Sequence, residues 1–110
     1  MDKEKIVLNE TQNDGKTVYL YYNKTVGFYT AFGLSAFFVT HVTNPVRSYS
    51  DELQMPVVIV NKRQILDLRQ SLREIEHTEH CYYHFETRGT IGEEGYQKWL
   101  DGILLRRKAV

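Results

Sequence analysis

One run of the sequence, residues 17–22 (Thr-Val-Tyr-Leu-Tyr-Tyr), is apolar or aromatic on both of its faces. In an extended chain, successive side chains point to opposite sides. Tyr19 and Tyr21 then share one face, and valine, leucine and a third tyrosine alternate with them on the other. A strand with two such faces is typical of a sheet interior that is covered on both sides. The run therefore predicts a sheet with helices packed on it.

A sharp turn and an aromatic segment follow at residues 25–36. Gly27 lets the backbone leave the strand without a steric penalty, and a helix is expected over residues 29–41. Phe28 would then lie at the corner between strand and helix. These aromatic side chains either pack in the core or, in the case of Phe28, project outward as an apolar wedge. Asn44-Pro45 ends the helix, because the residue before proline avoids the α region.

This segment resembles a signature of the MutS family of DNA mismatch repair proteins, Gly-Asp-Phe-Tyr-Glu-x-Phe-x-x-Asp-Ala, from the N-terminal mismatch-recognition domain. The matching residues are Phe28, Tyr29, Phe32 and Ala36. A weaker likeness extends the resemblance to residues 17–86, through the Pro56-led strand and the helix after it. The resemblance implies a similar fold and an apolar wedge at Phe28. The family's base-contacting Glu is replaced by Thr30. The apolar wedge is therefore kept, but the carboxylate that hydrogen-bonds the base is not.

The second half of the chain contains the clearest helix. Residues 56–60 form a short apolar run typical of a buried parallel strand. Asn61 and Gln64 match a capping box, and the apolar stripe that follows consists of Ile65, Leu68, Leu72 and Ile75, backed by Leu66. Residues 46–54 are expected to be a polar loop. Residues 81–86 alternate as a strand, and a capping box at Thr90 with an apolar stripe through Trp99 predicts a last helix.

These elements predict one α/β domain over residues 1–110, frayed at 1–4 and 108–110. A β-rich run at residues 6–8, followed by the turn dipeptide Asp14-Gly15, predicts that the domain opens with a β-hairpin. The sheet is expected to be mixed, with about four to five strands joined by right-handed crossovers.

A cluster of histidines beside Cys81 suggests a metal site, but the spacing argues against one. In a strand, His80 and His84 would lie about 13 Å apart, too far to share an ion bound at about 2 Å. His77 lies outside that strand. His80 cannot activate Cys81 within one strand, because neighbouring side chains face opposite ways. We therefore expect no metal, no cofactor and no catalytic residues.

The composition limits the classes of function. Fourteen basic residues balance fourteen acidic ones, so the chain lacks the overall positive charge that gives many nucleic-acid-binding proteins their non-specific affinity. The single cysteine fits a reducing compartment. No apolar run approaches the length of a membrane span, and we expect a cytoplasmic protein without a membrane partner.

The prediction for function is a small non-catalytic binding module, with nucleic acid as the leading partner. An apolar wedge and nearby cations are the groups expected to make contact, and they are Phe28, Tyr29, Thr30, Arg47, Lys62, Arg63 and Arg69. The alternative is a protein-interaction or self-association module, because the chain is neutral and has eight tyrosines, a residue enriched at protein interfaces.

Overall fold

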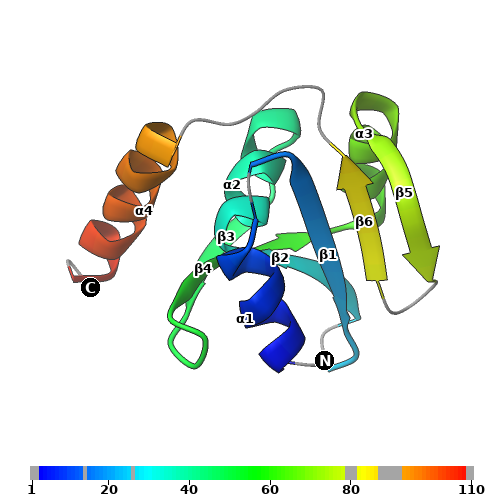
Figure 1. Cartoon of the computed structure of the whole chain (residues 1–110). Helices are drawn as coiled ribbons and strands as arrows, with labels where there is room; N and C mark the ends of the chain where they lie inside the picture. Colours follow the sequence, from blue (N-terminus) through cyan, green and yellow to red (C-terminus); the bar gives the residue numbers. More distant parts are fainter. Residues whose placement is uncertain (1–2, 14, 26, 79–81, 87–92, 109–110) are drawn as a thin grey trace.

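The computed structural model of the chain shows one six-stranded sheet with helices on both faces (Figure 1). It describes residues 3–13, 15–25, 27–78, 82–86 and 93–108. Along the chain the elements are α1 (Lys3–Thr11), β1 (Thr17–Asn23), β2 (Phe28–Phe32), α2 (Gly33–Val42), β3 (Val46–Ser50), β4 (Met55–Val60), α3 (Lys62–Ser71), β5 (Arg73–Thr78), β6 (Tyr82–Glu86) and α4 (Glu93–Lys108). The strand order is β3-β4-β2-β1-β6-β5.

The predicted α/β architecture is confirmed, but every described strand pair is antiparallel and the sheet is larger than expected. The strand expected at residues 56–60 exists as β4, which runs antiparallel to both β2 and β3. Two strands were not predicted: β3, where a polar loop was expected, and β5. Those two strands allow short antiparallel connections, whereas parallel neighbours need crossovers of about a dozen residues or more.

The start of the chain differs from the prediction. Residues 6–8 lie in helix α1, where Ile6 and Glu10 are buried one turn apart while Val7 and Leu8 are exposed. A hairpin does open the sheet, but it is formed by β1 and β2. Gly15 has the expected positive φ of 83° and connects α1 to β1.

The aromatic segment after Gly27 is a strand before it becomes a helix. Gly27 has a φ of 72° and forms the turn of the β1–β2 hairpin, so the predicted sharp turn is present. Helix α2 begins at Gly33, whose φ of 57° redirects the chain, and not at Tyr29. It ends at Val42, just before Asn44-Pro45, as expected.

The two faces of the sheet have separate cores. One face carries Val18 and Leu20 of β1 and is covered by α2 and α3 through residues such as Val39 and Leu68. The other face is covered by α1, whose Ile6 packs against Tyr21 and Phe32. This arrangement confirms that β1 is an interior strand with two apolar faces.

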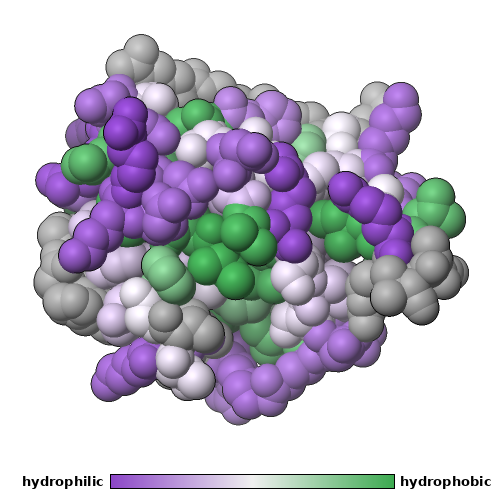
Figure 2. Space-filling view, turned by 180° about the vertical axis from the view of Figure 1, so that it is seen from behind, coloured by the Kyte–Doolittle hydropathy of each residue, from purple (hydrophilic) through white to green (hydrophobic). Residues whose placement is uncertain are grey.

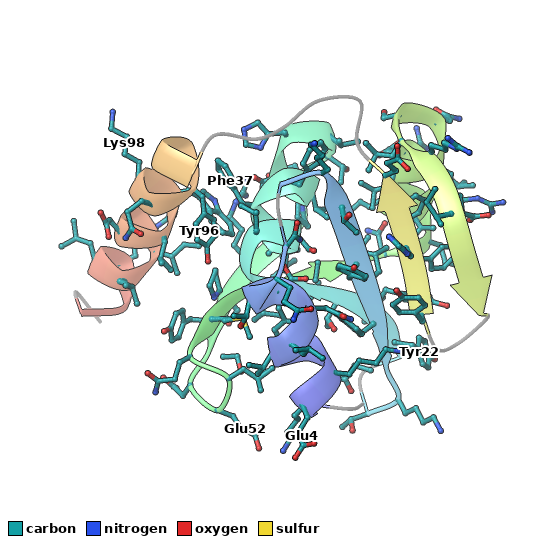
Figure 3. The ribbon with its side chains drawn as sticks, viewed as in Figure 1. Glu4, Tyr22, Phe37, Glu52, Tyr96 and Lys98 are labelled. Carbon is teal, nitrogen blue, oxygen red and sulfur yellow. The ribbon has the colours of Figure 1, made fainter. Side chains whose placement is uncertain are left out.

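Helix α4 packs against both α2 and the edge strand β3. Phe37 of α2 lies with its ring centre 5.8 Å from that of Tyr96 and 5.3 Å from that of Trp99. Figure 3 shows Phe37 and Tyr96 side by side between the two helices. None of the described helices is long and apolar enough to cross a membrane.

Candidate functional site

A pocket of about 500 Å³ lies between the β1–β2 hairpin and helix α3. One wall is the hairpin, the other is one side of the helix, and the buried side chains of Val60 and Tyr83 lie between them. Figure 3 shows Tyr22, on the hairpin wall, at the end of the sheet away from Tyr96 and α4. The pocket is therefore formed by the sheet and α3.

The hairpin wall consists of Tyr22, Gly27, Phe28 and Tyr29. The turn is fixed by its own hydrogen bonds: the Gly27 N–H donates to the Asn23 carbonyl over 2.9 Å, and the Thr25 N–H donates to Asn23 Oδ1 over 3.0 Å. Asn and Gly are the residue types that favour such turns. The turn leaves Phe28 45% exposed at the border of the pocket.

The helix wall consists of Lys62, Ile65, Leu66 and Arg69. Their spacing of three, four and seven residues places them along one side of α3. The predicted capping box is confirmed and fixes the start of this helix, because Asn61 Oδ1 accepts from the Gln64 N–H and Gln64 Oε1 accepts from the Asn61 N–H. Leu66, expected to back the core stripe, is instead 52% exposed.

Three tyrosine rings pack together at the pocket. The ring of Tyr29 meets those of Tyr22 and Tyr83 edge to face, with ring centres 5.2 and 5.0 Å apart. Tyr29 and Tyr83 are buried, while Tyr22 is partly exposed. Aromatic contacts of this geometry stabilise packing beyond the area that they bury. The aromatic rings of the hairpin wall are therefore held in place by packing against one another and against Tyr83.

Two cations, Lys62 and Arg69, line the pocket, and none of the lining residues is acidic. Arg69 Nε lies 3.5 Å from Glu74 Oε1, which orients the guanidinium but engages only one of its nitrogen atoms in that contact. The other N–H groups of an arginine fork can still bind an anion.

The structure brings together four of the seven predicted site residues, namely Phe28, Tyr29, Lys62 and Arg69. The other three are not among the lining residues. Thr30 is buried and donates through Oγ1 to the Tyr21 carbonyl. Arg47 lies on β3 and donates to Asn44 Oδ1, and Arg63 is 85% exposed beside Asp67.

Three residues that line the pocket were not among the predicted site residues: Tyr22, Leu66 and Tyr83. A signal was present for Leu66, because Lys62, Leu66 and Arg69 recur at helical spacing. No sequence signal links Tyr22 and Tyr83 to that helix. They reach it only through the pairing of strands β2, β1 and β6.

A second polar cluster lies at the junction of α1, α2 and β1, where it is closed to solvent. Glu10 Oε2 accepts from Ser35 Oγ over 2.7 Å, and Glu10 Oε1 accepts from the Ser35 N–H over 3.0 Å. Ser35 Oγ also accepts from the Tyr19 N–H. Burial raises the pKa of Glu10 to about 7, although the hydrogen bonds from Ser35 and Asn13 oppose the shift. This cluster joins three elements and has a structural role.

The described residues contain no group of three or more potential metal ligands. His84 stacks on Tyr19 with ring centres 4.8 Å apart. His80 and Cys81 lie outside the described residues, so the spacing argument against a metal site there is not tested.

No protein-family model matches the chain, and the comparisons with curated proteins and with solved structures returned no similar protein. The resemblance to the MutS family therefore stays a prediction. The motif residues Phe28, Tyr29 and Phe32 lie on strand β2, and Ala36 follows in α2.

Proposed function

We propose that this protein is a non-catalytic binding module that contacts nucleic acid through the pocket between the β1–β2 hairpin and α3. The observation that carries the proposal is the meeting of aromatic rings with two cations in a pocket lined by no acidic residue. Nucleic-acid-binding surfaces combine these groups, because cations attract phosphates and rings stack on bases. The proposed site of action is the cytoplasm, in line with the single cysteine.

The neutral net charge is compatible with this proposal, because the positive charge is local. Lys62 has no ion pair among the described residues. The guanidinium of Arg69 lies about two turns further along the same side of α3. Two phosphate contacts predict a weak to moderate affinity with a modest salt dependence. The complex should weaken by roughly ten-fold between about 50 and about 200 mM salt.

The test is a fluorescence anisotropy titration with labelled perfect duplex, mismatched duplex and single-stranded oligonucleotides at those two salt concentrations. The double variant Lys62→Ala/Arg69→Ala should lose most of the affinity, because it removes both cations of the pocket. The matched control is Lys98→Ala/Arg106→Ala, which removes the same charge from α4. Figure 3 shows Lys98 far from Tyr22.

Equal losses in the two double variants would show that only net charge matters and would contradict a site at the pocket. Absence of binding to every oligonucleotide at low salt would remove the proposed function altogether. Preference for the mismatched over the perfect duplex would support the MutS-like interpretation.

Self-association is the second candidate, and an observation on α1 favours it. The outer side of this helix has a shallow apolar groove of about 520 Å³, lined by Lys3, Glu4, Val7, Leu8 and Thr11. Val7 and Leu8 are exposed large apolar side chains. Light scattering over a range of concentrations tests this candidate, and a monomer at every concentration would exclude it.

A further inference from the structure

Two exposed apolar side chains border the pocket from opposite walls. Phe28 belongs to the hairpin wall and is 45% exposed, and Leu66 belongs to the helix wall and is 52% exposed. Large apolar side chains that remain open to solvent beside a cavity are typical of binding sites. Together with the partly exposed ring of Tyr22, these side chains can make apolar contacts with both faces of a flat ligand.

The cations flank these apolar residues along the helix. Lys62 and Arg69 are seven residues apart on the same side of α3, which corresponds to about 10 Å along the helix axis. Ile65 and Leu66 lie between them. The order along this side is therefore cation, apolar surface, cation.

The volume of the pocket limits what can enter it. About 500 Å³ is within the range of small-molecule sites and can hold one nucleotide. A base pair inside a duplex cannot enter, because its faces are covered by the neighbouring pairs. An unpaired base has a free face and can leave the strand to stack on protein side chains.

We propose that the pocket holds one unpaired nucleotide of a single strand, with its base between the hairpin aromatics and Leu66 and its two flanking phosphates at Lys62 and Arg69. This inference rests on the proposed function and specifies its ligand. Only an internal nucleotide of a strand carries a phosphate on each side, so a free mononucleotide can satisfy one cation at most. The apolar contacts carry no base specificity, because every base has a flat face.

The experiment compares four probes by competition with a labelled strand: a thymidine hexamer, a uridine hexamer, a perfect twelve-base-pair duplex and thymidine 5′-monophosphate. The structure predicts that one or both hexamers bind at least about ten-fold more tightly than the duplex or the mononucleotide. The ratio between the two hexamers identifies the preferred strand, DNA or RNA.

Two double variants separate the roles of the apolar and the charged groups. Phe28→Ala/Leu66→Ala should weaken hexamer binding by about ten-fold and leave the salt dependence unchanged. Both side chains are half-exposed, so circular dichroism should show an intact fold. Lys62→Ala/Arg69→Ala should instead reduce the slope of log affinity against log salt by about 1.4, the value for two phosphates of a single strand.

The matched control for the apolar variant is Val46→Ala/Leu105→Ala, which removes two side chains that are more exposed and do not line the pocket. Hexamer affinity should be unchanged in this control. Duplex binding as tight as hexamer binding, or equal affinity of the apolar variant and its control, would overturn the inference. In that case, if only Lys62→Ala/Arg69→Ala lost binding, the proposed nucleic-acid-binding function would still be supported. If no probe bound at all, both the proposed function and this inference would be contradicted.

Discussion

The pocket at the hairpin and the Glu10–Ser35 cluster are both polar regions at the ends of strand β1, yet they are built in opposite ways. At the pocket, cations and apolar side chains are exposed around a cavity of about 500 Å³. At the cluster, Glu10 and Ser35 are buried, and no buried side-chain polar atom of the described residues lacks a hydrogen bond.

The difference shows that the Glu10–Ser35 cluster stabilises the fold, whereas the pocket is accessible to a ligand. The pairing of β1 with β2 stops at Tyr21 and Thr30, so Tyr19, which pairs with His84 of β6 on its other side, has no partner in β2. Ser35 of the following helix supplies the missing acceptor for its N–H, and Glu10 binds Ser35 in turn. A buried polar group without a hydrogen-bond partner costs free energy, so the polar groups of this cluster must hydrogen-bond one another. The polar groups of the pocket are exposed to water and do not need partners within the protein.

The largest expected effect is the pH dependence of stability that arises from Glu10. Its pKa rises from 4.5 to about 7 on folding because burial disfavours the charged form. The folded state then binds more protons at Glu10 than the unfolded state between those values, so the contribution of Glu10 to stability is highest below about pH 4.5. It should fall by about 3 kcal/mol as the pH rises to about 7 and stay level above it. Urea unfolding at a series of pH values measures this change.

Glu10→Gln serves as the control, because it cannot ionise. The difference in unfolding free energy between the natural chain and this variant should change across the same pH window and nowhere else. Burial also raises the pKa values of Tyr21 and Tyr96, so their hydroxyls do not ionise in this range. Parallel pH curves for the two proteins would show that the Glu10 carboxyl is solvated and would break the contrast with the pocket.

Removal of the Ser35 hydroxyl should have the next largest effect. Ser35→Ala leaves the Tyr19 N–H without its acceptor and removes a donor to Glu10, which should cost about 2 kcal/mol of unfolding free energy. Ser48→Ala, on the exposed part of β3, should change stability by less than about 0.5 kcal/mol. Urea unfolding midpoints compare the two. A similar small change in both variants would mean that water replaces the lost hydroxyl.

The smallest effect concerns the helix that carries the pocket cations. Asn61→Ala removes the side-chain cap of α3 and should cost about 1 kcal/mol, because the Gln64 N–H loses its acceptor. Gln70→Ala, an exposed position in the same helix, should be nearly neutral. Thermal unfolding monitored by circular dichroism measures both. An unchanged midpoint for Asn61→Ala would mean that packing of Ile65 and Leu68 alone fixes the helix start.

The parts of the fold that the sequence predicted correctly depend on local patterns. The capping box of Asn61 and Gln64 is a contact within four residues, and it is confirmed. The alternation of Tyr83 and Phe85 with the more polar side chains of Tyr82, His84 and Glu86 also predicted strand β6 correctly. The predictions failed at residues 6–8, 29–32 and 46–50, and β5 was missed, because short apolar or mixed runs fit either a strand or another structure until a pairing partner is known.

The candidate site shows the same division. Phe28, Tyr29, Lys62 and Arg69 were each selected from residue type and position, but nothing in their spacing along the chain showed that they meet. They meet because Tyr29 pairs with Val60 in the sheet, which brings the hairpin beside the first turn of α3. A shift of that register by one residue would turn Tyr29 away from the helix.

The sequence alone determined the α/β class, the apolar interior strand and the helix after Asn61, since periodicity and capping act over a few residues. Only the tertiary structure decided that the sheet is antiparallel, that Glu10 and Ser35 share a closed cluster, and that rings and cations surround one pocket. These features depend on contacts between residues far apart in the chain, which no local pattern encodes. Figure 2, the view from behind, shows hydrophobic surface in the middle of that face between hydrophilic regions, an arrangement that likewise arises only when the elements pack.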